Sequence, residues 1–127
     1  MKNRTIILTL IVFSILVSAC KYDFILPEEV PVVVPGADPI SFSQKIVPIF
    51  TEKCVACHKI GGTAPDLSSA NAYNSINTAK YINKTTPASS LIYSEASPAT
   101  NVHSHKKYSA SEAALVLIWI TEGAKNN

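Results

Sequence analysis

The sequence lacks an excess of charge of either sign. Its 127 residues include 11 lysines and arginines and 9 aspartates and glutamates, so the formal net charge is +2. Lys2 and Arg4 belong to a segment that we expect to be removed, and without them basic and acidic residues are equal in number. Binding of nucleic acid needs a concentrated basic face, so this balance excludes nucleic acid as a partner.

The sequence also lacks a long apolar run. Its longest apolar-dominated stretch, residues 6–17, is too short to cross a bilayer, because a membrane-spanning helix needs about 20 apolar residues. The stretch follows a basic start and precedes the small residues Ser18 and Ala19, which is typical of an export signal. Residues 1–19 are therefore predicted to be a signal peptide that is removed.

Only three cysteines are present, and the first lies directly after this signal. The four residues Val17-Ser18-Ala19-Cys20 resemble a bacterial lipobox, in which the cysteine is acylated and becomes the first mature residue. Acyl chains contribute about 0.8 kcal/mol per buried methylene group, so acylated Cys20 would hold the protein at a lipid membrane. Export and this resemblance together imply a location outside the cytoplasm. An ordinary signal peptide is the alternative.

Four prolines follow Cys20, at positions 27, 31, 35 and 39. Proline removes backbone donors and favours an extended, semi-rigid chain. Residues 20–40 are therefore predicted to be a tether between the lipid and the folded domain. Packing of residues 32–34 as an edge strand is the alternative.

Helix signals predict an all-α domain of about four helices over residues 41–127. Ser41 with Gln44 and Ser109 with Glu112 have the spacing of helix N-caps, and Gly123 stands where the last helix is expected to stop. A buried strand over residues 115–120 is the alternative for the last element. The expected helices are one with Pro48 in its first turn that ends near the cysteines, one over residues 69–82, a short one from Pro87 to Tyr93, and one between Ser109 and Gly123.

The residues that carry chemistry are Cys54-Val55-Ala56-Cys57-His58, the C-x-x-C-H pattern of covalent haem attachment. Two thiols separated by two residues can reach the two vinyl groups on one porphyrin edge, and the adjacent histidine then lies under the iron. The pattern predicts one haem c, bound covalently through Cys54 and Cys57, with His58 as the proximal iron ligand. With Cys20 acylated, no cysteine remains without a role.

The C-x-x-C-H pattern has three other interpretations. A disulfide switch normally lies between a strand and a helix, which the pattern here does not predict. A zinc site needs four ligands, and His103 with His105 would have to join the cysteines at a spacing tighter than usual. A structural disulfide between Cys54 and Cys57 leaves His58 unexplained.

The strings IVPIFTEKCVACH, GGTAPDL and IWITEGAKNN resemble small class I-like monohaem c-type cytochromes, in a lipoprotein form. The resemblance covers most of residues 41–127 and implies a small cytochrome c-like bundle around one covalently bound haem. It also implies that the first and last helices cross near the haem, with Phe50 and Trp119 at the crossing. By the same resemblance the Pro65 carbonyl accepts a hydrogen bond from the outer nitrogen of His58, which would orient the ring.

The sequence departs from that family by lacking a methionine for the sixth iron position, because Met1 is its only methionine and leaves with the signal. Relatives place the distal ligand where this chain has His103 and His105. We predict His103 as the distal ligand, with His105 as the alternative and Lys106 or Lys107 as weaker candidates. Methionine raises the haem potential, so a second histidine predicts a potential below that of methionine-ligated relatives.

These features predict a membrane-tethered electron carrier that exchanges electrons with redox protein partners and is not itself an enzyme. Two alternatives stay open. The first is a haem-based gas or redox sensor with an open or displaceable sixth position. The second is a haem subunit of a larger oxidoreductase.

Overall fold

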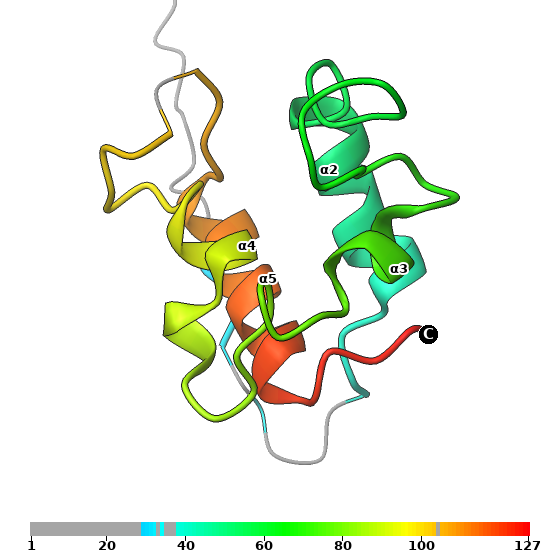
Figure 1. Cartoon of the computed structure of the whole chain (residues 1–127). Coiled ribbons are helices and arrows are strands. Elements are labelled where there is room, and N and C mark those ends of the chain that lie inside the picture. The colour runs from blue at the N-terminus through cyan, green and yellow to red at the C-terminus, as the bar shows by residue number, and fades with distance from the viewer. Residues whose placement is uncertain (1–28, 33, 35–37, 104) are drawn as a thin grey trace, which may run out of the picture.

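The structure, a computed structural model, describes residues 29–32, 34, 38–103 and 105–127 (Figure 1). The predicted signal peptide, Cys20 and most of the predicted tether lie outside the described residues. Val32 and Val34 are exposed and belong to no strand, so the described part of the tether gives no support to an edge strand.

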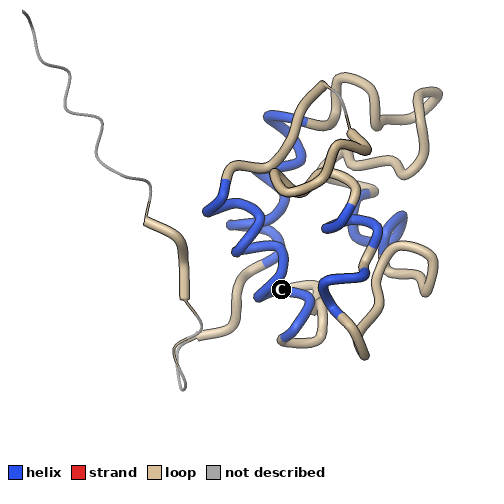
Figure 2. The backbone as a smooth tube through the Cα atoms, turned by 90° about the vertical axis from the view of Figure 1, so that its left-hand side faces the viewer, coloured by secondary structure: helices blue, strands red, loops and turns tan. Residues whose placement is uncertain are grey.

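Within the described residues the chain is helical and has no strand, which confirms the prediction of an all-α domain. α2 and α3 lie on one side of the domain and α4 and α5 on the other (Figure 1), and loops make up much of the chain between them (Figure 2). None of the described helices is long and apolar enough to cross a membrane. The elements are the π-helical turn η1 (Phe42–Ile46), α2 (Val47–Lys53), α3 (Ala72–Ile76), the 3₁₀ turn η2 (Pro87–Ser89), α4 (Leu91–Ser94) and α5 (Ala110–Thr121).

The start of the domain follows its sequence signals. Ser41 is the N-cap of η1, and its hydroxyl accepts a hydrogen bond from the backbone N–H of Gln44 at 3.3 Å. Helix α2 carries Pro48 in its first turn, where proline loses no hydrogen bond within the helix. Cys54 is the C-cap of α2, so the C-x-x-C-H segment begins where this helix stops.

The last helix also begins and ends as predicted. The Ser109 hydroxyl accepts from the backbone N–H of Glu112, and the Glu112 carboxylate accepts from the backbone N–H of Ser109, which completes a capping box. Gly123 follows the helix with a φ of 102°, a left-handed conformation that favours glycine. Residues 115–120 lie inside α5, so their interpretation as a strand was wrong.

The middle of the chain is less helical than predicted. Instead of one helix over residues 69–82, only α3 is formed, because Asp66 holds the preceding turn through Ser68 and Asn71. The helix ends at Asn77, whose ψ of 59° leaves the helical region. The predicted helix from Pro87 to Tyr93 is split into η2 and α4 by Ser90, which is extended.

Aromatic side chains join the first and last helical elements. The ring centre of Phe42 lies 5.1 Å from that of Trp119, 5.3 Å from that of Tyr73 and 6.4 Å from that of Phe50. η1 packs against α5, and Phe42 contacts both of the aromatic residues that the resemblance placed at a helix crossing. Phe42, Phe50 and Trp119 are fully buried, so this cluster is the centre of the core.

The end of the chain closes over the start of the domain. The backbone carbonyl of Asn127 accepts from the N–H of Ser43 at 2.9 Å, and its side-chain oxygen accepts from the N–H of Phe42 at 2.9 Å. The Glu122 carboxylate accepts from the N–H of Ile40 at 2.7 Å. These contacts fix the point at which residues before Ile40 leave the domain.

Replacing Phe42 with alanine is expected to lower the free energy of unfolding by about 3–5 kcal/mol, the usual effect of removing a buried aromatic side chain. Chemical denaturation of the two proteins measures this difference. Val32→Ala is the control, because Val32 is 75% exposed and its loss should leave the unfolding midpoint unchanged. An equal effect of both substitutions would contradict this description of the core.

Candidate functional site

The C-x-x-C-H segment forms a tight turn at the end of α2. The backbone N–H groups of Cys57 and His58 both donate to the carbonyl of Cys54, at 3.1 and 2.9 Å. The Cys54 N–H in turn donates to the carbonyl of Phe50 at 2.8 Å. The two cysteines and the histidine are therefore held on one turn, and this turn is anchored to the core through Phe50.

The loop that follows folds back onto this turn. The Thr63 N–H donates to the Cys57 carbonyl and the Leu67 N–H to the His58 carbonyl, both at 2.9 Å. Gly62 is needed there, because a Cβ at this position would lie 2.3 Å from the Cys57 carbonyl oxygen. Because the loop folds back in this way, the Pro65 carbonyl lies next to the His58 ring.

The His58 ring is oriented by that carbonyl. Its Nδ1 lies 3.3 Å from the Pro65 oxygen, the pair of atoms that the resemblance implied would be in contact. A carbonyl oxygen only accepts, so Nδ1 is the nitrogen that carries the proton and donates. The second ring nitrogen, Nε2, is then the one with a lone pair available for a metal ion.

His58 lines a cavity of about 300 Å³ between the two halves of the domain. Small-molecule sites in proteins have volumes of about 300–1,000 Å³ and mostly apolar walls. Cys54, Pro65 and His103 also line it, so four of the predicted site residues meet here. Sequence reasoning missed the apolar side chains that complete the wall, which include Leu67, Tyr81, Leu91, Ile92, Ala96 and Tyr108.

His103 lines the same cavity as His58 and lies close to it. The two ring centres are 6.2 Å apart and the ring planes are inclined by 30°. The Nδ1 atom of His103 is buried and has no hydrogen-bond partner in the described part of the chain. A buried polar atom without a partner is rare in a folded protein and calls for an explanation such as an ion.

The loop that carries His103 is closed at its base. The Tyr108 N–H donates to the Ala96 carbonyl at 2.9 Å. The Thr100 hydroxyl lies within hydrogen-bond distance of the carbonyls of Ser94, Glu95 and Ser97, and Lys107 donates to the Thr100 carbonyl. These contacts tie the loop to the end of α4.

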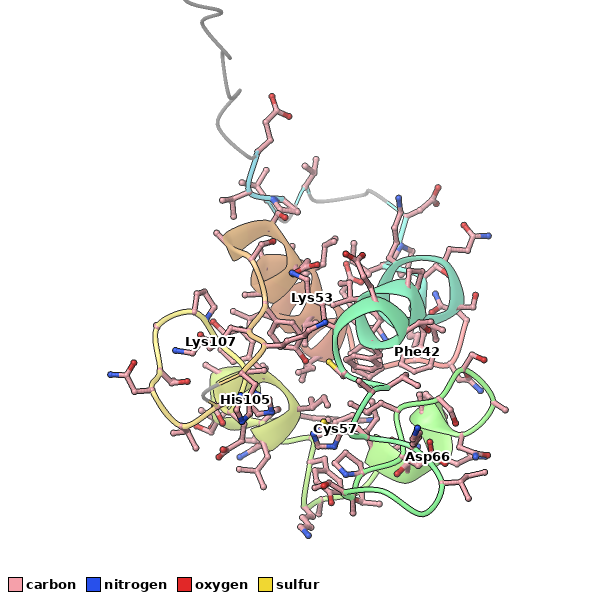
Figure 3. All side chains as sticks on the ribbon, turned by 90° about the horizontal axis from the view of Figure 1, so that it is seen from above. Phe42, Lys53, Cys57, Asp66, His105 and Lys107 are labelled. Carbon is pink, nitrogen blue, oxygen red and sulfur yellow. The ribbon has the colours of Figure 1, made fainter. Side chains whose placement is uncertain are left out.

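Two predicted site residues lie outside the cavity wall. His105 is exposed, as is Cys57, and neither lines the cavity. Figure 3 shows His105 beside α4. Lys106 does line the cavity, whereas Lys107 makes the contact with Thr100. Of the two histidines considered for the distal position, the structure therefore brings only His103 to His58.

Asp66 organises the loop and does not line the cavity. Its carboxylate accepts from the Ser68 N–H and hydroxyl and from the Asn71 side chain, at 2.9, 2.6 and 2.8 Å. The hydrogen bonds from Ser68 contribute most to lowering its pKa below the ordinary aspartate value. Asp66 therefore stays ionised and joins the loop after His58 to the start of α3.

The alternatives to a haem site find no support among the described residues. Cys54 and Cys57 are not joined in a disulfide. The part of the chain that the structure describes contains no group of three or more histidine, cysteine, aspartate or glutamate side chains that could hold a metal ion. A structural zinc site takes four ligands. A larger hollow of about 510 Å³, lined by residues such as Asn77 and Lys84, contains neither cysteine nor histidine.

Burial raises the pKa of the Cys54 thiol to about 11, and the negative charge of Glu112 contributes to the shift. In protein prepared without haem, alkylation of Cys54 is therefore expected to be slow at pH 8 and to accelerate as the pH approaches 11, because the thiolate is the reactive form. A Cys57→Ser variant leaves Cys54 as the one cysteine of this turn, and mass spectrometry of the peptides separates it from Cys20. Unfolding in urea, which removes the burial, should accelerate the reaction at pH 8; equal rates with and without urea would contradict the assignment.

The chain matches no protein-family model, no curated protein and no solved structure. The site must therefore be interpreted from its own residues. Its features are a C-x-x-C-H turn, a mostly apolar cavity and two histidine rings in the wall of this cavity.

Proposed function

We propose that this protein is a membrane-tethered monohaem c-type cytochrome that carries electrons outside the cytoplasm. The observation that carries the proposal is that His58 and His103 line one cavity, with ring centres 6.2 Å apart, and that the wall of this cavity includes Cys54. In this proposal Cys54 and Cys57 attach one haem c, and the domain has a cytochrome c-like architecture. Acylated Cys20 is the membrane anchor.

The distance between the two histidine rings fits a shared iron ion. Two imidazole rings that bind one metal from opposite sides have centres about 6.3 Å apart, because the ligating nitrogen lies about 2.0 Å from the metal and about 1.15 Å from its own ring centre. The observed distance is 6.2 Å. A metal bound by Nδ1 of His103 would also account for the absence of a hydrogen-bond partner at this buried atom.

Each of the residues around the site then has a definite task. When bound, the haem iron supplies one-electron chemistry. Pro65 holds the tautomer and orientation of His58, and the contacts of Thr100 and Lys107 hold the loop that presents His103. Apolar side chains such as Ile92 and Leu67 exclude water from the site. None of these tasks binds or activates a second substrate, which favours a carrier over an independent enzyme.

The physiological role follows from the tether and the ligands. A small domain on a membrane tether can move between redox protein partners at one membrane surface. With two histidine ligands, the haem potential would lie below that of methionine-ligated relatives. A periplasmic location on the outer membrane is part of the proposal and rests on the resemblance to lipoprotein forms of small c-type cytochromes.

The proposal is tested by the mass of the full-length protein expressed in a bacterium that exports it and attaches haem c. We expect the intact mass to increase by one haem, and the added mass to lie on the peptide that contains residues 54–58. The added mass should survive denaturation in acid acetone, which extracts haem that is not covalently bound. Exported protein of unmodified polypeptide mass would contradict the proposal.

A further inference from the structure

The cap of α5 places a carboxylate directly behind the cavity wall. Glu112 accepts a hydrogen bond from the Ser109 N–H at 2.6 Å and is needed there to cap the helix. Its side chain is only 17% exposed. The residue before Ser109 is Tyr108, which lines the cavity and is itself buried. The capping carboxylate therefore lies in a partly dry environment close to the proposed haem.

Lys53 neutralises this carboxylate from the other side. Its Nζ atom lies 2.5 Å from the Glu112 Oε2 atom, and its side chain is 24% exposed. Figure 3 shows Lys53 between α2 and α5. Lys53 directly precedes Cys54, so the ion pair links the C-x-x-C-H turn to the first turn of α5. It is the only salt bridge within the described residues.

The charges of this pair reach the cavity wall. After burial, the Glu112 charge is the next cause that raises the pKa of Cys54, whereas Lys53 acts in the opposite direction. Glu112 also contributes to the raised pKa of Tyr108, behind burial and Cys54. Two side chains on the wall therefore experience the Glu112 charge, and one of them experiences the compensating charge of Lys53.

We propose that Lys53 is a charge-compensating residue that prevents the α5 capping carboxylate from lowering the haem potential. The inference rests on the proposed function, because it requires a haem in the cavity. Ferric iron carries one more positive charge than ferrous iron, so an uncompensated negative charge nearby stabilises the ferric state. The helix cap requires Glu112, and Lys53 cancels its electrostatic effect on the iron while tying α2 to α5.

The test is a spectroelectrochemical titration of four haem-loaded, full-length proteins: wild type, Lys53→Gln, Glu112→Gln and the double variant. At the wild-type midpoint, the ratio of reduced to oxidised protein is expected to fall roughly fivefold in Lys53→Gln. It should rise roughly fivefold in Glu112→Gln, the order of effect expected of one partly screened unit charge behind the cavity wall at an effective dielectric constant of about 20. The double variant should return to within about twofold of wild type.

Opposite shifts separate this role from a merely structural one. Both single substitutions break the same ion pair, so both should lower the unfolding midpoint, and a general loosening of the site would move both potentials in the same direction. Lys45→Gln is the control for removal of a lysine charge, because Lys45 is exposed on η1, and it should leave the potential near that of wild type.

Three outcomes would overturn the inference. The inference would be overturned if the potentials of the two single variants shifted in the same direction, or if both were unchanged. The protein would still bind haem in either case, so the proposed function would stand. A double variant whose potential differs from that of wild type as much as the potential of a single variant does would also overturn the inference. Protein that carries no haem would overturn the proposed function and this inference together, so the two failures are distinguishable.

Discussion

Replacing His103 with alanine is expected to convert a low-spin haem into a high-spin haem that binds carbon monoxide. The ring of His103 is the one that lines the same cavity as His58, at a distance between ring centres of 6.2 Å. Without it the iron would keep only His58, and its sixth position would be open. Ferric and ferrous optical spectra of the purified variant, recorded with and without carbon monoxide, measure the change.

His105→Ala is the matched control for this experiment. His105 lies two residues further along the same loop, but it is exposed and does not line the cavity. Its removal should leave the spectra of the wild type unchanged. If His105→Ala opened the iron and His103→Ala did not, the assignment of the distal ligand would be reversed. Unchanged spectra in both variants would point to another ligand, with Lys106 the next candidate because it lines the cavity.

Replacing Cys54 and Cys57 together with serine is expected to abolish covalent haem attachment. Both thiols lie on the turn formed by the hydrogen bonds from Cys57 and His58 to the Cys54 carbonyl, and no other described cysteine could replace them. We expect protein with no haem that survives denaturing gel electrophoresis, detected by peroxidase staining. The effect should be all or none, because serine hydroxyls do not add to vinyl groups under the conditions of maturation.

The third cysteine provides the control for those substitutions. Cys20→Ser is expected to leave the haem stain intact and to release the protein from the membrane fraction, because the proposed anchor would be lost. This variant separates the lipid role of Cys20 from the haem role of the other two cysteines. Loss of the haem stain in Cys20→Ser as well would indicate that the stain reports a failure of export and not the absence of haem ligation.

Local signals in the sequence predicted the ends of the fold well. The capping residues at Ser41 and Ser109, the position of Pro48 and the stop at Gly123 each act through their own backbone geometry. Such effects need no knowledge of the rest of the chain. The helices that begin and end at these residues carry the C-x-x-C-H turn and the wall behind it.

The middle of the chain depends on contacts that local patterns do not contain. The predicted helix over residues 69–82 shrinks to α3 because the Asp66 side chain holds the preceding turn. Ser90 breaks the next predicted helix, and its hydroxyl accepts from the Asn83 N–H at 2.9 Å. Asp66 forms its hydrogen bonds within the turn before α3, and Ser90 bonds to the backbone across a loop. Contacts of this kind compete with helix formation.

The same distinction applies to the candidate site. A spacing of two residues between cysteines identified the C-x-x-C-H turn, and the absence of a mature methionine directed attention to His103 and His105. The choice between those histidines needed the loop conformation, which depends on contacts made by Thr100 and Tyr108. The pairing of Lys53 with Glu112 joins residues 59 positions apart, so no local pattern predicts it.

The most direct test of the account is a set of optical spectra of the purified, full-length wild-type protein, in ferric and ferrous states and with carbon monoxide. The account predicts a covalently bound haem that is low-spin in both states and unchanged by carbon monoxide, because His58 and His103 occupy both axial positions. A haem that is high-spin or that readily binds carbon monoxide would contradict this ligation and favour a sensor. Exported protein without any haem spectrum would contradict the proposed function itself.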